Sequence, residues 1–443
     1  MSETIFDPEN KEFVNILDLM ENTNSNLFIT GEAGTGKSTL LRHFVSTTIK
    51  NVAVLAPTGL AAINAGGQTI HKFCLFPPRF ITAEDIKTTK NPIHKKLLQQ
   101  LDTILLDEVS MVRADQLDGI DRFLRINRKK NLPFGGVQMI LIGDLFQLPP
   151  VVNNQEMSLF SQIYQSPYFF SSQVFTEIDL PHVSLVKNYR QQSDLKFISI
   201  LRDIKKGSIS PELIDAINQQ FKPEFNNSAF SKEDIFINLA TTNQIALQIN
   251  TVKLNELDGD NVEYWADLEG EFNERDCPAE NILTLKKNAQ IMFIKNDNQG
   301  RWVNGTMGTV EEASEDKIVV KLENGNVYTL STEKWNNVKF EFDENEDKIT
   351  PKIVGSMTQY PIKLAWAVTI HKSQGQTFDK LLIDLGRGAF SHGQTYVALS
   401  RARNLSGIRL KRRVLPSDFI LDKRVVQFMQ SVENHDMDVA RVI

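Results

Sequence analysis

The segment from Gly31 to Ser38, which reads GEAGTGKS, restricts the fold of this chain more than any other part of the sequence. It follows a short apolar run, NLFIT from Asn26, and precedes a stretch of helical character, STLLRHFVSTTI. Glycines placed between a buried strand and a helix let backbone N–H groups converge on phosphate oxygens at the helix N-terminus. The order of strand, glycine-rich loop and helix therefore predicts a phosphate-binding loop in an α/β domain.

The side chains of this loop have separate expected tasks. Lys37 neutralises charge on the β- and γ-phosphates of a nucleotide, and the Ser38 hydroxyl is a ligand for Mg²⁺. The other candidate nucleotide contacts are the loop glycines and the threonines beside them: Gly31, Gly34, Thr35, Gly36 and Thr39. A nucleoside triphosphate and Mg²⁺ are therefore the expected cofactors.

Three further apolar runs are typical of buried parallel strands, namely VAVLA from Val52, TILL from Thr103 and VQMILI from Val137. Asp107 and Glu108 follow the second run, at the edge where open α/β sheets bind their ligands. We expect Asp107 to hold the Mg²⁺ and Glu108 to orient and polarise an attacking water.

The third run leads into GDLFQLPP, which begins at Gly143. The amide of Gln147 in this stretch can sense a γ-phosphate through a hydrogen bond that is lost on hydrolysis. The same stretch also reads as a turn that Pro149 and Pro150 close at the end of a strand, and the two interpretations are compatible.

A second α/β pattern begins near Pro181 and continues with IFINLA from Ile235, WAVTI from Trp366 and LLIDL from Leu381. These runs have the length and apolar character of buried strands. The sequence therefore predicts a second lobe of the same class as the first.

The sequence changes character between residues 285 and 349, where short β-branched and aromatic runs are separated by Asn-Gly pairs at 304–305 and 324–325. Such pairs are the strongest short hairpin signal, so we expect an inserted small β-barrel. The acidic stretch at 341–347 is predicted to be a solvated turn that leaves this barrel. The predicted division is a first lobe at 1–73 and 101–180, an excursion at 74–100, a second lobe at 181–284 and 350–443, and an insertion at 285–349.

Composition narrows the class of protein. The 49 Lys and Arg residues against 55 Asp and Glu give a net charge of −6, which argues against a basic surface that coats nucleic acid but leaves room for a groove. Cys74 and Cys277 lie far apart in no metal-ligand spacing, so neither a disulfide framework nor a zinc site is predicted. No apolar run approaches the roughly 20 residues of a membrane helix. We expect a cytoplasmic protein without a membrane partner, associated with the nucleoid if its source is bacterial.

Seven motifs follow one another along the chain: GEAGTGKST, APTGLAAINAGGQTIHKF, DEVSM, the PFGGVQ that leads into GDLFQLPPV, NYRQ, WAVTIHKSQGQTF and YVALSRAR. In this series, which spans almost the whole chain, the sequence resembles superfamily-one helicases of the 5′-to-3′ class and most closely the petite integration frequency (Pif-one) helicases. The resemblance implies two RecA-like P-loop NTPase lobes, with a small wedge subdomain at 74–100 and an SH3-like β-barrel at 285–349. It also implies ATP as the nucleotide.

The resemblance assigns further residues to the nucleotide site. Arg190, in NYRQ, and Arg401, in ALSRAR, would reach the γ-phosphate from the second lobe as arginine fingers. Tyr189 and Gly375 would also contact the nucleotide. Asn10 stands where the family commonly has a glutamine that reads the adenine edge, and its shorter arm leaves adenine selectivity open.

The resemblance also implies a track for single-stranded DNA. Hydroxyls and imidazoles suit such a track because they bond phosphate oxygens without adding a fixed charge that would trap the strand. The implied track residues come from both lobes: Thr58, Thr69, His71, Thr369, His371 and Ser373. In the wedge, Phe76 and Pro77 would form a rigid apolar tip against the duplex junction; a buried loop anchor is the alternative for Phe76. Asn288 replaces a family glycine and can adopt the positive φ of that turn.

The expected function is an ATP-dependent DNA helicase that moves 5′ to 3′ on single strands and unwinds 5′-tailed or forked duplexes. G-quadruplex DNA is a further candidate partner, a monomer is expected, and DNA repair, recombination and telomere maintenance are the expected processes. The alternatives are a DNA-stimulated ATPase or binding module without strand separation, and a phosphate-loop kinase or GTPase. The last class is disfavoured because the chain has no Asn-Lys-x-Asp guanine reader and a kinase needs no second lobe with its own arginines.

Overall fold

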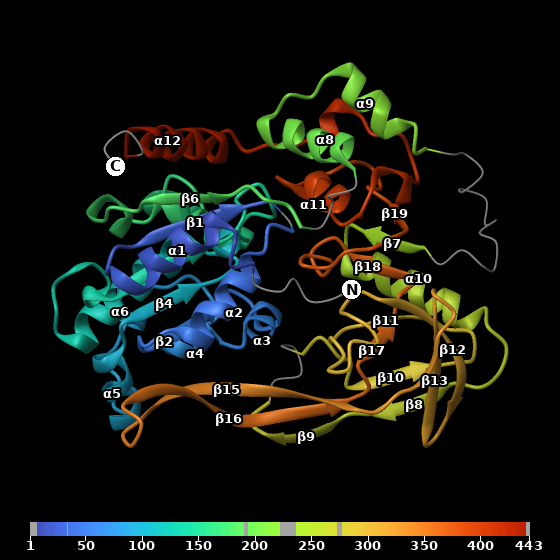
Figure 1. Ribbon diagram of the computed structural model, residues 1–443, viewed down its shortest axis with the longest axis horizontal. Helices are drawn as coiled ribbons and strands as arrows, with labels where there is room; N and C mark the ends of the chain where they lie inside the picture. Colours follow the sequence, from blue (N-terminus) through green and yellow to red (C-terminus); the bar gives the residue numbers. More distant parts are fainter. Residues whose placement is uncertain (1–6, 33, 190–193, 222–235, 273–276, 440–443) are drawn as a thin grey trace.

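The computed structural model describes residues 7–32, 34–189, 194–221, 236–272 and 277–439. Two parallel sheets form the centres of two lobes, and an antiparallel region runs along one side of both (Figure 1). Within the described residues, no helix combines the length and the apolar character needed to cross a bilayer.

The first lobe is built on a six-stranded parallel sheet in the order β3-β2-β4-β5-β1-β6. Every residue of β1, β2, β4 and β5 is buried, which explains why these runs are largely apolar instead of alternating. Its strands are β1 Leu27–Gly31, β2 Val52–Ala56, β3 Gln68–Thr69, β4 Thr103–Leu106, β5 Gln138–Ile142 and β6 His182–Leu185. Its helices are α1 Lys11–Asn22, α2 Lys37–Thr47, α3 Gly59–Ala65, α4 Ile70–Cys74, α5 Pro92–Gln100, α6 Ala114–Arg128 and α7 Asn154–Ile163.

The second lobe is built on a four-stranded parallel sheet in the order β18-β7-β19-β20. Its strands are β7 Ile237–Ala240, β18 Ala367–Thr369, β19 Leu381–Ile383 and β20 Ile408–Leu410. Its helices are α8 Leu195–Lys206, α9 Pro211–Asn218, α10 Asn243–Asn255 and α11 Gln394–Ser400.

The described 3₁₀ turns of both lobes are η1 Ala83–Asp85, η2 Val109–Met111, η3 Pro133–Gly136, η4 Phe169–Ser171, η5 Val174–Glu177, η8 Leu405–Gly407 and η9 Pro416–Asp418. The two parallel sheets confirm the predicted α/β class.

The insertion is antiparallel, as the Asn-Gly pairs predicted. It contains a five-stranded sheet in the order β14-β13-β12-β11-β17, a pair β10-β8 and a three-stranded sheet β15-β16-β9. Its strands are β8 Val262–Trp265, β9 Asp267–Gly270, β10 Ile282–Leu285, β11 Gln290–Phe293, β12 Met307–Ser314, β13 Lys317–Leu322, β14 Val327–Thr329, β15 Glu333–Asp343, β16 Lys348–Gln359 and β17 Ile362–Leu364. Gly325, with φ of +85°, turns the chain from β13 into β14, and Asn288 has the expected positive φ of +67°.

The boundaries predicted for the insertion, 285 and 349, are wrong. The antiparallel pairing begins at β8 and ends at β17, because the strands at both ends of the segment complete sheets whose other members lie inside it. Alternating patterns of short strands show that a β region is present but not which distant strands close it.

The hairpin of β15 and β16 leaves the insertion and reaches α5 of the first lobe (Figure 1). Phe340, Phe342 and Ile349 join the hydrophobic core of the first lobe, and the backbone N–H of Ile349 donates to Asn51 Oδ1 at 2.8 Å. The acidic stretch 341–347 therefore contains an exposed tip, as predicted, but its flanks are packed against a second part of the molecule instead of leading away into solvent.

Two predicted limits of the second lobe are also wrong. Strand β6 pairs in parallel with β1, where Phe28 lies beside His182, so residues 182–185 belong to the first sheet. The C-terminal helix α12, Lys423–Val439, packs on the first lobe, and the Phe428 ring stacks on Phe170 with centroids 4.3 Å apart. The apolar face of α12 indicates that the helix is covered, but nothing in its sequence says by which lobe.

Candidate active site

The phosphate-binding loop lies where β1 ends and α2 begins, as predicted. Gly34 and Gly36 have φ of +90° and +88°, a left-handed conformation that residues with a Cβ rarely adopt. A Cβ on Gly36 would lie 2.8 Å from the ring of Phe13, so glycine is required there for space as well. The buried Thr35 hydroxyl donates to the Glu32 carbonyl at 2.9 Å and braces the loop. The loop therefore keeps an open cradle of N–H groups at the helix N-terminus.

The Lys37 side chain folds back onto the start of this loop. Its Nζ donates hydrogen bonds to the carbonyl oxygens of Gly31 at 2.7 Å and Glu32 at 3.0 Å, and burial lowers the pKa of its ammonium group. Ser38 and Thr39 follow in the first turn of α2, where the Ser38 side chain is exposed. The loop thus presents one cation and one accessible hydroxyl beside the backbone donors.

The two predicted carboxylates stand at the end of β4. The Glu108 backbone has φ of +50°, and its N–H donates to Asp107 Oδ1 at 2.9 Å. Burial and the neighbouring charge of Asp107 raise the pKa of Glu108 to about 7, and burial raises the pKa of Asp107 as well. A carboxyl that titrates near neutral pH is suited to accept a proton from water.

The donors at this point fit a magnesium nucleotide. Ser38 offers a hydroxyl and Asp107 a carboxylate, and both are oxygen ligands of the kind that Mg²⁺ prefers. The raised pKa values of Asp107 and Glu108 show that their negative charge is poorly compensated by the surrounding protein. A divalent cation bound here would supply the missing positive charge.

The loop after β5 carries Gln147 into contact with the second lobe. The Gln147 Oε1 accepts a hydrogen bond from Gln374 Nε2 at 3.2 Å, and the neighbouring residue Gly375 has φ of +78°. A Cβ on Gly393 would lie 2.3 Å from the Phe146 carbonyl oxygen and 2.5 Å from that of Gln147. The predicted sensor therefore lies on the contact between the lobes, where the backbones approach so closely that only glycine fits.

Asp144 in the same loop was not among the predicted site residues. Its carboxylate is buried and accepts a hydrogen bond from the Tyr396 hydroxyl at 3.1 Å. Lys205 of α8 forms an ion pair with the other oxygen at 3.3 Å and lies over the Phe146 ring at 5.0 Å. Lys205 and Lys37 hold the pKa of Asp144 below its usual value although burial acts in the opposite direction. Its position at the end of a buried strand, like that of Asp107, is the sequence signal that could have identified it.

Arg401 is fully buried at the end of α11. Its guanidinium donates to the carbonyl oxygens of Val397 at 3.0 Å and Ser373 at 3.2 Å, and to Ser400 Oγ at 2.9 Å. Burial lowers its pKa to about 10, and the charge of Glu108 acts to raise it. The second lobe therefore brings a buried cation into the electrostatic field of the predicted catalytic carboxylate. Arg190, the other predicted arginine finger, lies outside the described residues.

Asn10 and Tyr189 lie together beside the phosphate-binding loop. Asn10 caps α1 by accepting the Glu12 N–H at 2.9 Å, and its Nδ2 donates to the Tyr189 hydroxyl at 3.0 Å. The Tyr189 N–H donates to the Gly34 carbonyl at 2.8 Å. Both residues therefore lie beside this loop, and the Asn10 amide serves a helix cap and a tyrosine in this structure.

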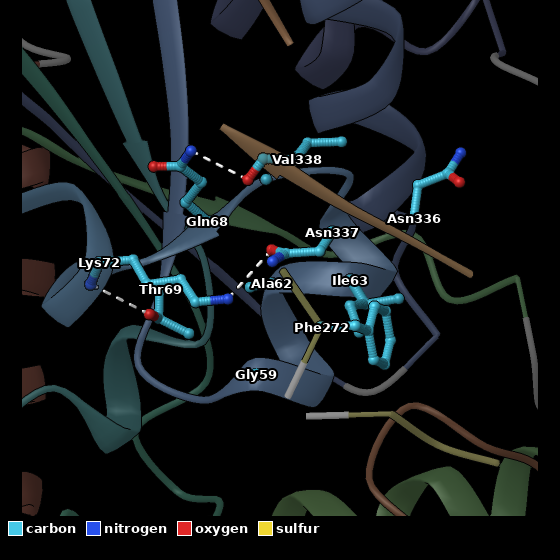
Figure 2. A pocket seen from close by; sticks show the side chains of 11 residues that line it. Gly59, Ala62, Ile63, Gln68, Thr69, Lys72, Phe272, Asn336, Asn337 and Val338 are labelled. Carbon is cyan, nitrogen blue, oxygen red and sulfur yellow. Dashed lines mark hydrogen bonds between the residues drawn. The ribbon is translucent and has the colours of Figure 1, made fainter. Parts of the chain in front are cut away.

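On the first lobe, the predicted track residues lie at helix starts. Thr58 caps α3 and Thr69 caps α4, with Oγ1 of Thr69 accepting the Lys72 N–H at 3.3 Å. Figure 2 shows that this surface is lined by β15 of the insertion: Lys72 Nζ donates to Asn337 Oδ1 at 3.0 Å. His71 is half-buried, and burial lowers the pKa of its imidazole, so the neutral ring is favoured near pH 7.

On the second lobe, the hydroxyls of two predicted track residues are turned into the protein in this structure. Ser373 is fully buried, and its Oγ donates to the Ile370 carbonyl at 2.7 Å. Thr369 is also buried, with its Oγ1 accepting the Lys372 N–H at 3.2 Å. Both hydroxyls are used to form the turn after β18, while His371 between them stays half-buried.

The predicted exposed tip at Phe76 is wrong. Phe76 is buried and packs edge-on against Phe123 of α6, with ring centroids 5.9 Å apart. A Cβ on Gly119 would lie 3.0 Å from the Phe76 ring, which shows how closely the ring is seated on α6. Phe76 is thus the buried loop anchor that was the alternative, and Pro77 after it is half-buried.

Sequence comparison places this geometry in a family. A family model described as PIF1-like helicase matches residues 7–213. The chain is 31% identical over 432 residues to the ATP-dependent DNA helicase Pif1 of Bdellovibrio bacteriovorus, an alignment that covers 95% of this chain and 92% of that relative. It spans a smaller share, 61%, of the longer PIF1 helicase of Rattus norvegicus, to which it is 33% identical over 91% of its own length.

Comparison with solved structures points to the same family as the sequence comparison. Bacteroides sp Pif1 in complex with ADP-AlF4 matches with a TM-score of 0.90 at 34% identity, covering 97% of this chain and 98% of that one. Bacteroides Pif1 bound to ssDNA matches over the same shares with a TM-score of 0.70, so parts of that molecule are arranged differently. With this identity over nearly the full length, the chain belongs to the PIF1-like helicases, a family of ATP-dependent DNA helicases.

Proposed function

We propose that this protein is an ATP-dependent helicase that moves 5′ to 3′ on single-stranded DNA and unwinds 5′-tailed or forked duplexes. The observation that carries the proposal is the meeting of two lobes at one site. Lys37 and Glu108 come from the first lobe, and Arg401 comes from the second lobe and acts electrostatically on Glu108. A site divided between two lobes can convert nucleotide turnover into relative movement of those lobes.

The chain's own residues would divide the hydrolytic work. The loop N–H groups and Lys37 hold the phosphates, and Ser38 with Asp107 holds the Mg²⁺, which screens the phosphate charge when bound. Glu108 orients the attacking water and accepts its proton on a carboxylate oxygen. Arg401, once released from its carbonyl partners, stabilises charge at the γ-phosphate, and Arg190 has the same assignment from the family resemblance.

Movement along DNA would follow from remaking the contacts between the lobes. Gln147 with Gln374 and Asp144 with Tyr396 join the lobes directly. Closure on ATP and opening after hydrolysis would alternate which lobe holds the strand, with about one nucleotide of advance per cycle because the lobes approach by only a few ångströms. Indivisible steps of several nucleotides in single-molecule records would contradict this step size.

The finer architecture belongs to the same proposal. We assign residues 74–100 to a wedge subdomain and the five-stranded antiparallel sheet with its neighbours to an SH3-like barrel, on two RecA-like lobes. Bacteroides Pif1 has been solved bound to ssDNA, and another similar structure concerns DNA unwinding at forked dsDNA by two coordinating Pif1 helicases, which supports DNA partners for this chain. A nucleotide contact by Asn10, G-quadruplex binding, a monomeric state, a cytoplasmic or nucleoid location and roles in DNA repair, recombination and telomere maintenance complete the proposal.

A single comparison tests the central proposal. Duplexes with a 5′ tail, a 3′ tail or no tail are mixed with the protein, MgATP and a trap strand, and strand release is measured. We expect release from the 5′-tailed duplex only. Faster release from the 3′ tail would reverse the direction, and ATP turnover stimulated by single strands without release from any duplex would leave a DNA-stimulated ATPase.

A further inference from the structure

Helix α8 of the second lobe carries two cations that reach across to the candidate active site of the first lobe. Arg202 and Lys205 stand three positions apart, so they project from the same face of the helix. Arg202 Nε donates to Glu32 Oε1 at 3.3 Å, and Lys205 pairs with Asp144 at 3.3 Å. Glu32 belongs to the phosphate-binding loop and Asp144 to the loop after β5. One helix of the second lobe therefore touches the site at two points.

The opposite face of α8 is fixed in the second lobe. Phe197 and Ile204 are buried in the hydrophobic core that surrounds the second sheet. Asp194 caps the helix by accepting the Phe197 N–H at 2.9 Å, and its other carboxylate oxygen accepts the Leu405 N–H at 3.0 Å. Because the helix is anchored in this way, Arg202 has to move with the second lobe.

Glu32 is the residue at which the phosphate-binding loop is braced. Its carbonyl oxygen accepts hydrogen bonds from Lys37 Nζ at 3.0 Å and from the Thr35 hydroxyl at 2.9 Å, while its carboxylate accepts the bond from Arg202. The Glu32 side chain is only 18% exposed, and its charge lies close enough to Tyr396 of α11 to act on that hydroxyl. Glu32 therefore faces the second lobe and joins the loop that surrounds the phosphates to α8.

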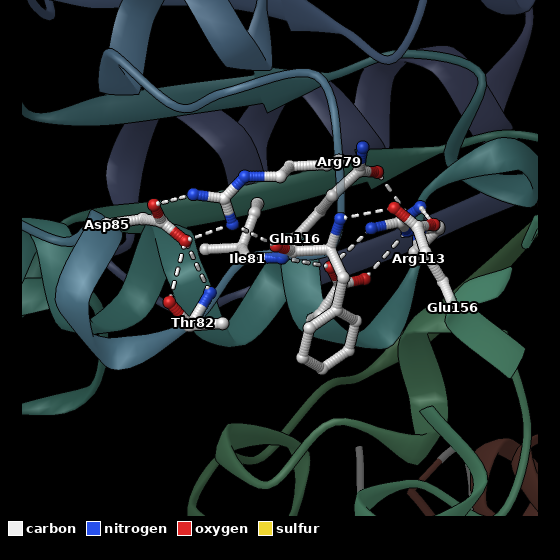
Figure 3. Close-up of polar contacts among 9 residues, drawn as sticks. Arg79, Ile81, Thr82, Asp85, Arg113, Gln116 and Glu156 are labelled. Carbon is white, nitrogen blue, oxygen red and sulfur yellow. Dashed lines mark hydrogen bonds and ion pairs between the residues drawn. The ribbon is translucent and has the colours of Figure 1, made fainter. Parts of the chain in front are cut away.

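The position of this ion pair in the molecule sets it apart from ordinary surface pairs. Arg79 also has an exposed side chain, but it pairs with Asp85 inside the first lobe (Figure 3). A pair of that kind contributes little to function, because both partners move together. Arg202, whose side chain is 47% exposed, lines a groove beside its contact with Glu32. The pair of Arg202 and Glu32 has to break whenever the two lobes separate.

We infer that Arg202 is a positioning residue of the nucleotide cycle, whose ion pair with Glu32 holds the lobes together over bound nucleotide and slows the release of ADP. The inference rests on the proposed function, in which ATP is hydrolysed between the two lobes. A nucleotide enclosed between lobes leaves only when they open, and opening or product release limits turnover in many enzymes. The pair raises the barrier to opening and leaves the chemical step at Glu108 unchanged.

The test removes the charge at each end of the pair. Arg202→Met keeps the stem of the side chain without its donors, Glu32→Gln keeps the shape without the charge, and the double variant completes a mutant cycle. Stopped flow measures the dissociation of a fluorescent ADP analogue with Mg²⁺, beside hydrolysis in a single turnover of ATP on single-stranded DNA. We expect each single variant to release ADP about two- to fivefold faster, with hydrolysis in the single turnover changed less than about twofold. The double variant should release ADP no faster than either single variant.

Lys206→Met supplies the matched control, because Lys206 is an exposed cation in the last turn of the same helix. A second measurement uses salt, which screens the pair and should speed ADP release more in the unmodified protein than in Arg202→Met. Unchanged ADP release in Arg202→Met, an equal effect of Lys206→Met, or additive effects in the double variant would overturn the inference and leave the proposed function standing. An unmodified protein that hydrolyses no ATP would overturn the proposed function and the inference with it.

Discussion

The hydroxyl of Tyr396 donates a hydrogen bond to the buried carboxylate of Asp144 at 3.1 Å and thereby joins α11 of the second lobe to the end of β5 in the first. Lys205 pairs with the same carboxylate from α8. Asp144 lies within the electrostatic field of Lys37 as well, so one carboxylate connects the phosphate-binding loop with two helices of the opposite lobe.

Removing the Tyr396 hydroxyl should therefore weaken communication between the lobes more than nucleotide binding. We expect Tyr396→Phe to lower DNA-stimulated ATP turnover about 5- to 10-fold with ATP affinity changed less than about twofold, since a lost hydrogen bond to a buried charge costs about 1 to 3 kcal/mol. Tyr264→Phe is the matched control, because that hydroxyl bonds the Ser314 carbonyl inside the insertion. Equal effects of the two substitutions on turnover would show that the contact with Asp144 has no special part in coupling.

Removing the Glu108 charge should separate nucleotide binding from hydrolysis. Glu108→Gln is expected to bind ATP and single-stranded DNA normally while hydrolysis falls more than about 100-fold, because the amide cannot accept a proton. Lys37→Ala should lose both ATP turnover and unwinding. Turnover assays and fluorescent-nucleotide binding distinguish the two variants, with the exposed Glu311→Gln as the control, and near-normal hydrolysis by Glu108→Gln would remove this residue from the mechanism.

The raised pKa of Glu108 predicts that Glu108→Gln, which lowers hydrolysis, raises the stability of the folded protein. Its pKa is about 7 in the folded protein against 4.5 for the free group, so the folded state keeps a proton that the unfolded chain loses between these values. Stability without nucleotide should fall as pH rises from about 4.5 to about 7 and stay reduced above that, by on the order of 3 kcal/mol. Urea unfolding in EDTA should therefore find Glu108→Gln more stable than the unmodified protein at pH 8 and equal to it near pH 4.5. A difference that does not depend on pH would contradict the assignment of the shift to this carboxyl.

The aromatic contact of α12 predicts a stability effect far from the active site. Phe428 stacks on Phe170 and also meets Phe28, Phe169 and Phe175. Phe428→Ala should lower the free energy of unfolding by about 3 kcal/mol, as expected for a large aromatic side chain lost from packed surroundings.

The control for α12 is Phe390→Ala, whose ring is 61% exposed and whose loss should change stability by less than about 0.5 kcal/mol. Urea unfolding followed by circular dichroism measures both variants. If they lost similar amounts of stability, α12 would have no firm attachment to the first lobe.

The elements that carry a strong local signal were predictable from the sequence. The runs at β2 and β4 match the observed strands residue for residue, because a buried parallel strand is apolar along its whole length and ends where the polar site begins. Lys37, Asp107 and Glu108 became candidate site residues for the same reason, because each directly follows a buried strand or a glycine-rich loop.

The contacts between distant segments were not predictable. Tyr396 and Asp144 are 252 positions apart, and neither neighbourhood carries a pattern that names the other. The same holds for β6, whose short alternating run fits either sheet, and for Phe76, because an aromatic residue before two prolines suits an exposed tip as well as a buried anchor. In each case the deciding quantity was the shape of a surface made by residues far away in the chain.

The return of α12 to the first lobe gives the two lobes a second covalent link. The chain crosses once between β6 and α8 and again between β20 and α12. Two tethers at different points forbid free separation of the lobes and favour rotation about the line that joins the crossings. The second tether begins beside His392. The ring of His392 is hydrogen-bonded to the Leu145 carbonyl of the first lobe and to the Asp422 backbone N–H, so the connection that limits opening starts next to the nucleotide site.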